Sequence, residues 1–175
     1  SSNLYPRQGG ELVRVAIETR INPGCHLNHA PTEADLGDGG GVGTETVVSL
    51  TGEDIEWSPV LYPKPHKLPQ PLPGEPDLWI YGHEGTIVFY AIGRSEVGED
   101  VDPETISALI TGLTCEDDGT CIPGKEELES EGEGPDRLFD RFPKTLTADA
   151  IGGAGPNTDP EAGPGPGAEA GPGPG

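Results

Sequence analysis

Apolar and polar residues alternate along several short stretches of the chain, with the period of two that places successive side chains on opposite faces of a β-strand. In residues 11–21, ELVRVAIETRI, the apolar Val13, Val15 and Ile17 fall on one face, whereas Arg14 falls on the other. β-Branched residues dominate this stretch, and they fit the pleated surface of a sheet. We therefore predict a strand here. Similar short apolar runs predict further strands within residues 44–52, 86–93 and 104–115.

No segment shows a long apolar period of 3.6 residues between good helix caps. The best helical candidate is the short stretch 135–146, PDRLFDRFPKTL, which contains Leu138, Phe139 and Phe142. Short strands separated by Gly- and Pro-containing turns are typical of antiparallel sandwiches. The sequence therefore predicts an all-β fold, an immunoglobulin-like two-sheet β-sandwich with long loops.

Two long segments between the strands, 22–43 and 62–82, contain too much Gly, Asp or Pro for regular structure, and the second should be extended loop or edge strand. The chain ends in a Gly/Pro-rich sequence, which offers little apolar area to offset chain entropy. We therefore expect a β-sandwich domain over 1–130 and an acidic linker that can hold a short helix over 131–145. Residues 146–175 should form a disordered or extended tail with few contacts to the domain.

Acidic residues dominate the charge of the chain. Ten Lys and Arg stand against 31 Asp and Glu, which gives a formal net charge of -21 at pH 7. This charge repels phosphate backbones and anionic membrane surfaces, so we expect no nucleic-acid partner. No run approaches the roughly 20 apolar residues that a membrane helix needs, so we also expect no membrane insertion. The high content of acidic residues is most simply explained by solubility, and it does not indicate a function.

Cys115 and Cys121 flank a short acidic turn, EDDGT. A close cysteine pair is more typical of an oxidising compartment than of the cytosol, which favours export. The spacing does not supply the paired ligands of a tetrahedral zinc site. The two residues can meet if the segment folds back as a hairpin, and Asp and Gly provide the turn chemistry for it. Closing so short a loop stabilises a fold by only roughly 2 kcal/mol, so such a pair is better placed for exchange than as a structural staple.

The third cysteine opens the sequence CHLNH, which contains Cys25, His26 and His29. These three residues are a partial copper or zinc site, which would need a fourth ligand such as His66 or His83 from elsewhere in the fold. A free or partly buried cysteine is the simpler interpretation, although an odd cysteine can also pair between chains. We therefore predict no metal and no other cofactor.

Three stretches resemble one protein family. SALITGLTCEDDGTCIPGKEEL, residues 107–128, looks like the redox-active hairpin in the N-terminal domain of the DsbD thiol:disulfide interchange protein and its relatives, where a strand runs into C-x5-C and an apolar-Pro step. IETRINPGCHLNHAP, residues 17–31, is similar to the first strand and NPG turn of such domains. IEWSPVLYPKP, residues 55–65, resembles the passage that precedes the loop shielding their cysteines.

The resemblance implies an immunoglobulin-like domain that passes electrons by thiol-disulfide exchange, an oxidoreductase-type activity, to or from thioredoxin-like partners. It implies a periplasmic, cell-envelope or secreted location. From the hairpin geometry we predict that Cys115 and Cys121 form a disulfide that leaves out Cys25. On the family pattern, Cys121 forms mixed disulfides with partners, and Cys115 resolves them. A cap loop covers the pair in this family. The corresponding candidates here are Leu78, Trp79 and Tyr81, with Glu75 and Asp77 as the acids.

A second class of function stays open beside the first. The chain can instead be an immunoglobulin-like structural or binding module of the cell surface, with an inert hairpin disulfide. The redox behaviour of the pair distinguishes the two classes, because a buried structural disulfide has a reduction potential of about -300 mV or lower. We favour exchange, because short local loops make weak staples.

Overall fold

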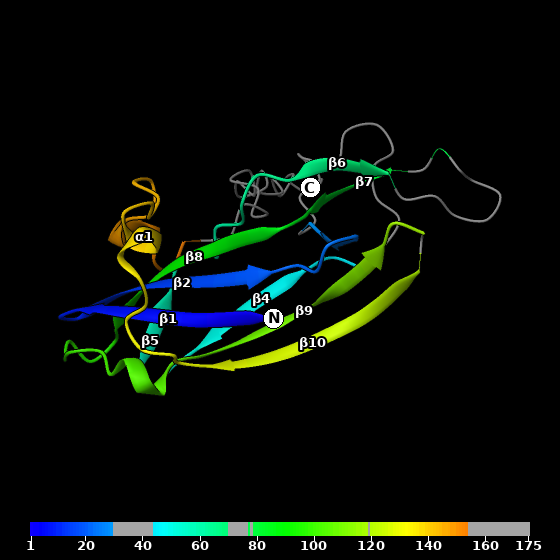
Figure 1. Cartoon of the computed structure of the whole chain (residues 1–175). Coiled ribbons are helices and arrows are strands. Elements are labelled where there is room, and N and C mark those ends of the chain that lie inside the picture. The colour runs from blue at the N-terminus through cyan, green and yellow to red at the C-terminus, as the bar shows by residue number, and fades with distance from the viewer. Residues whose placement is uncertain (30–43, 70–76, 78, 119, 154–175) are drawn as a thin grey trace, which may run out of the picture.

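The structure is a computed structural model, and it describes residues 1–29, 44–69, 77, 79–118 and 120–153. The described strands form two antiparallel sheets that face each other (Figure 1). One sheet has the order β1 (Ser2–Gly9), β2 (Leu12–Arg20), β8 (Thr86–Ser95) and β5 (Ile55–Trp57). The other has the order β10 (Cys121–Glu129), β9 (Ser107–Glu116), β3 (Cys25–Asn28), β7 (Trp79–His83) and β6 (His66–Pro69). A sixth strand of this second sheet, β4 (Val47–Thr51), pairs with β9.

This arrangement confirms the predicted all-β, immunoglobulin-like sandwich. Each of the four predicted runs contains a strand, β2, β4, β8 and β9, although β8 and β9 extend slightly beyond them. The prediction of irregular structure over 22–43 is wrong at β3, where four residues pair with both β9 and β7. Neighbouring strands, rather than local sequence preference, hold this short segment extended.

The core lies between the two sheets. Phe89 of β8 is fully buried in this core. The four-stranded sheet contributes Val13, Val15, Ile17 and Phe89 to this core, and the other sheet contributes Leu27, Val48, Ala108 and Ile110. These residues recur with the period of two within their strands, so the opposite faces of both sheets point away from the core.

Residues 134–153, here called the C-terminal strap, pack on the outer face of the four-stranded sheet (Figure 1). The strap contains the helix α1 (Asp136–Phe139) and the short 3-10 helix η2 (Ala148–Ala150); a further 3-10 helix, η1 (Pro103–Thr105), precedes β9. Leu138 and Phe139 of α1 are buried against Ala16 of β2, with Tyr90 beside them. The predicted short helix is thus present, and it rests on apolar positions of β2 and β8.

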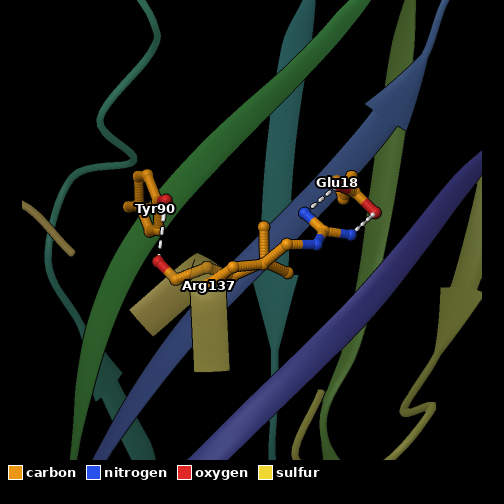
Figure 2. Close-up of polar contacts among 4 residues, drawn as sticks. Glu18, Tyr90 and Arg137 are labelled. Atoms are coloured by element: carbon orange, nitrogen blue, oxygen red, sulfur yellow. Dashed lines mark hydrogen bonds and ion pairs between the residues drawn. The ribbon is translucent and has the colours of Figure 1, made fainter. Parts of the chain in front are cut away.

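Polar contacts fasten the strap at several points. The Arg137 guanidinium donates to both carboxylate oxygens of Glu18, at 2.6 and 3.0 Å, and the Tyr90 hydroxyl donates to the carbonyl of residue 138 at 2.9 Å (Figure 2). Further along, Arg94 donates to the Ala148 carbonyl at 3.3 Å. Residues near η2 therefore contact the sandwich, whereas the sequence predicted few contacts from residue 146 onward. Within the described part of the chain, no helix is long and apolar enough to cross a bilayer.

Candidate functional site

Cys115 and Cys121 form a disulfide across the β9–β10 hairpin. They occupy directly opposed positions at the end of the two strands nearest the turn, and their Cα atoms are 4.0 Å apart. The adjoining pair is bonded through its backbone, since the Glu116 N–H donates to the Thr120 carbonyl at 2.8 Å. Antiparallel pairs alternate between bonded and non-bonded positions, and side chains approach most closely in the latter. The predicted disulfide is confirmed, and Cys25 is outside it as a free thiol.

The turn of this hairpin is fixed by its own hydrogen bonds. Asp118 Oδ1 accepts a hydrogen bond from the Thr120 N–H at 2.8 Å, and this bond lowers the pKa of the Asp118 carboxyl. The Asp117 N–H donates to the Gly24 carbonyl at 3.1 Å, in the turn between β2 and β3. Gly24 has a φ of 76°, a left-handed conformation that glycine adopts without steric cost. The NPG turn therefore anchors the tip of the cysteine hairpin to the sheet.

The two sulfur-bearing residues differ in exposure. Cys115 is 1% exposed, whereas Cys121 is partly exposed at the start of β10. The next residue, Ile122, is 59% exposed, and alternation along β10 places its side chain on the other face of the sheet. An incoming molecule can therefore reach the disulfide more readily from the Cys121 side.

A row of three side chains crosses β10, β9 and β3 on the outer face of the six-stranded sheet. Cys121 is directly opposed to Cys115, and Cys115 is directly opposed to His26. Opposed residues of antiparallel strands point to the same face, with Cβ atoms about 4.5–5.5 Å apart. Leu27, the neighbour of His26, belongs to the core, so His26 and both cysteines lie on the opposite face. His26 is only 2% exposed, which makes it a buried imidazole beside a buried sulfur.

Two of the cap-loop candidates, Trp79 and Tyr81, lie in β7 and are half-buried. Their rings contact each other edge to face with centroids 5.2 Å apart, and Lys67 Nζ lies 3.8 Å from the centroid of the Trp79 ring. Both residues share a strand face with His83, which is opposed to the core residue Leu27. Strand alternation thus places them on the face opposite to the disulfide.

The other cap candidates precede β7. Asp77 is an exposed turn residue two positions before the strand. Leu78 and Glu75 lie outside the described residues. The cap role of these five positions stays a prediction.

The CHLNH segment does not gather into a metal site. Cys25 and His26 are adjacent in β3, so their side chains point to opposite faces. His29 instead contacts His83, with its Nδ1 2.9 Å from Nε2 of that ring. Across the described residues, no group of three or more His, Cys, Asp or Glu side chains is placed to hold a metal ion.

His83 is the buried member of this histidine pair. It is 2% exposed, and burial is the main cause that lowers its pKa to about 4, followed by repulsion from His29 and His66. The ring of His29 also stands edge to face with Tyr62, centroid to centroid 5.9 Å, and Tyr62 in turn contacts Phe89. The pair therefore belongs to the inner face of the sheet, away from the disulfide.

Comparison with known proteins found structural likeness but no relative in sequence. No protein-family model matches the chain, and no curated protein matches it. Among solved structures, the chain is similar to the N-terminal periplasmic domain of ScsB from Proteus mirabilis, with 18% identity and a TM-score of 0.48. The match covers 81% of this chain and 53% of that one, so the chain spans about half the length of that structure.

Proposed function

We propose that this chain is a thiol-disulfide exchange domain that passes electrons through Cys115 and Cys121 to or from thioredoxin-like partners. The observation that carries the proposal is the unequal exposure of the two cysteines. Cys121 is partly exposed and Cys115 is 1% exposed, in one disulfide at the end of a hairpin. We place the domain in the periplasm, the cell envelope or the extracellular space, where a disulfide persists.

The difference in exposure assigns a role to each sulfur. In exchange, a thiolate attacks one sulfur along the S–S axis, and the electron pair of the broken bond leaves on the other sulfur. Access limits which sulfur is attacked. Cys121 therefore forms the mixed disulfide with the partner. Cys115, shielded from solvent, is released as the thiol that later resolves the mixed disulfide.

This disulfide contributes little to the stability of the surrounding structure. β9 and β10 are already paired in register from Cys115 and Cys121 to Ser107 and Glu129. Closing the short loop between the cysteines adds only roughly 2 kcal/mol by the chain-entropy model. A typical domain is stable by about 5–15 kcal/mol, so the fold can tolerate reduction of the pair. Reversible reduction without unfolding is what an exchange domain requires.

Two single-cysteine variants test the roles. Both carry Cys25→Ser, so that one thiol remains: Cys121 in the Cys115→Ser variant and Cys115 in the Cys121→Ser variant. The partner is a thioredoxin-like protein that lacks its resolving cysteine and whose remaining cysteine is activated as a mixed disulfide with thionitrobenzoate. Attack by the domain thiol releases coloured thionitrobenzoate and leaves a stable covalent complex, because no second thiol can resolve it.

The variant that keeps Cys121 should form the complex about tenfold faster or more, since access limits the attack. Equal rates would refute the assignment of roles while sparing the exchange function. The exchange function itself fails if the wild-type disulfide also resists reduction at potentials well above about -300 mV. That result would favour the structural or binding module.

A further inference from the structure

We propose that His26 is the proton donor and acceptor for Cys115 during exchange. The inference rests on the proposed function. It starts from the row on the outer sheet face, in which His26 of β3 is directly opposed to Cys115 of β9, and Cys115 to Cys121 of β10. From the sequence, His26 was interpreted only as a candidate ligand of a metal site.

The need for such a residue follows from the burial of Cys115. When a partner thiolate attacks the Cys121 sulfur, the S–S bond breaks and its electron pair leaves on the Cys115 sulfur. Cys115 is 1% exposed, so water cannot readily solvate the negative charge that develops there. An unpaired charge in such a position is strongly unfavourable. A proton or a positive charge next to this sulfur would remove that cost.

The imidazole of His26 can supply this proton to the Cys115 sulfur. Histidine is the side chain that gains and loses a proton between about pH 5 and 8, and opposed positions in a sheet place the two Cβ atoms about 4.5–5.5 Å apart. In the forward step, protonated His26 gives its proton to Cys115, so the products are the Cys121 mixed disulfide, a Cys115 thiol and neutral His26. In the reverse step, His26 takes the proton from Cys115, and the thiolate then attacks the mixed disulfide.

Two acidic residues lie near His26 in the register of the sheet. On the β9 side, Asp117 follows Cys115 by two positions and bonds through its N–H to the Gly24 carbonyl. On the β7 side, Glu84 continues the register of the β3–β7 pair opposite His26, one position beyond the strand. Both carboxylates are exposed, and neither stands between His26 and Cys115 in the register of β3 and β9.

The test follows reduction of the wild-type disulfide by dithiothreitol, a small neutral dithiol that becomes a cyclic disulfide as the domain gains two electrons. The rate is measured from about pH 5 to 8, the range in which histidine titrates, and divided by the fraction of dithiothreitol present as thiolate. This corrected rate should rise as the pH falls, because the proposed step consumes a proton that His26 delivers. In His26→Gln, the rise should vanish, and the corrected rate at about pH 6 should be lower by about tenfold or more.

His83→Gln is the matched control. It makes the same replacement at another position of the same sheet that is 2% exposed, but on the opposite face. It should keep the wild-type pH profile, and circular dichroism and thermal melting should establish that both variants are folded. If His26→Gln does not fold, the wild-type profile decides alone: a corrected rate that is flat with pH refutes the role of His26. A wild-type disulfide that dithiothreitol does not reduce refutes the exchange function instead.

Discussion

Arg137 of the C-terminal strap holds both carboxylate oxygens of Glu18 in β2, a pair separated by 119 positions in the sequence. This contact fastens the strap to the outer face of the four-stranded sheet, and the bonded Arg137 guanidinium lowers the pKa of the Glu18 carboxyl. Arg137 is 60% exposed in its side chain, however, so solvent screens much of the attraction. The apolar residues next to it should therefore matter more for stability than the ion pair does.

The first prediction separates these two contributions. Arg137→Gln should lower the free energy of unfolding by at most about 1 kcal/mol, the range of exposed ion pairs. Phe139→Ala should lower it by about 3 kcal/mol or more, because it opens a cavity over Ala16 and removes the ring that Arg7 covers at 4.0 Å. Urea titration measures both. Similar losses for the two variants would show that the strap is held by charge.

The second prediction concerns pH. Because the pKa of His83 is lowered to about 4 in the folded protein, the unfolded chain takes up a proton first as the pH falls. The stability that this residue contributes is complete above about pH 6.5, the ordinary histidine value, and is lost as the pH falls towards 4. The free energy of unfolding should therefore fall by about 1–1.5 kcal/mol between about pH 7.5 and 5.5 from this group. His83→Gln should lack this part of the pH dependence.

The control for that experiment is His66→Gln, which replaces an exposed histidine of β6. Because repulsion from His66 is the smallest of the causes that lower the His83 pKa, this variant should keep most of the wild-type slope of stability against pH. An identical slope in wild type, His66→Gln and His83→Gln would mean that burial of His83 does not govern the acid response. Denaturant titrations at four or five pH values suffice.

The third prediction compares two glycines that face each other across β9 and β10. A Cβ on Gly112 would lie 2.8 Å from Thr46 Oγ1 and 3.2 Å from Thr46 Cα, whereas a Cβ on Gly124 meets nothing nearer than 4.0 Å. Gly112→Ala should therefore cost about 1–3 kcal/mol, the usual cost of overpacking. Gly124→Ala should change the stability by about 0.5 kcal/mol or less, as surface substitutions do. The two melting curves should separate clearly, and coincident curves would contradict the close approach of Thr46.

The fourth prediction uses the charge of the hairpin turn. Glu116, Asp117 and Asp118 are exposed beside the disulfide, so they repel the attacking thiolate of glutathione, which carries additional net negative charge from its carboxylates, more strongly than the attacking thiolate of dithiothreitol. Raising the ionic strength from about 0.01 to 1 M shortens the screening length from about 30 to 3 Å. Reduction of the disulfide by glutathione should accelerate over this range more than reduction by dithiothreitol does.

A double variant sharpens the fourth prediction. Glu116→Gln with Asp117→Asn removes two of the charges and leaves the Asp118 bond to Thr120 in place. The salt effect on glutathione should shrink in this variant. If salt accelerates both reductants equally, repulsion by the turn is not its cause.

The strands that the sequence predicted share a visible pattern. β2 and β8 contain β-branched residues that alternate along the strand, because one face of each strand packs in the core. β3, with the sequence CHLN, contains no such pattern and exists because β9 and β7 supply hydrogen-bonding edges on both sides. The position of His26 opposite Cys115 depends on this long-range register. Periodicity along one segment carries no information about it.

The strap shows a similar limit. Its apolar residues Leu138 and Phe139 were visible in the sequence, but the composition around them is that of a linker. The missing information was that Ala16 and Tyr90 lie on the outer face of the sheet, where they need a cover. The domain boundaries at residues 130 and 145 stay predictions. The cysteine hairpin, in contrast, could be predicted from the sequence, because its two cysteines and its turn are contiguous in the chain.

The register between β9 and β10 has a kinetic consequence for exchange. Reduction breaks the S–S bond but not the pairing of the two strands or the bond from Asp117 to the Gly24 turn. The Cys115 thiol therefore stays opposite Cys121 at a high effective concentration, which for well-oriented groups can reach about 10⁵ M or more. A mixed disulfide on Cys121 has this internal competitor beside it throughout its lifetime. Covalent complexes of the wild-type domain should be short-lived, so their steady-state amount reports the rate of resolution rather than the affinity for the partner.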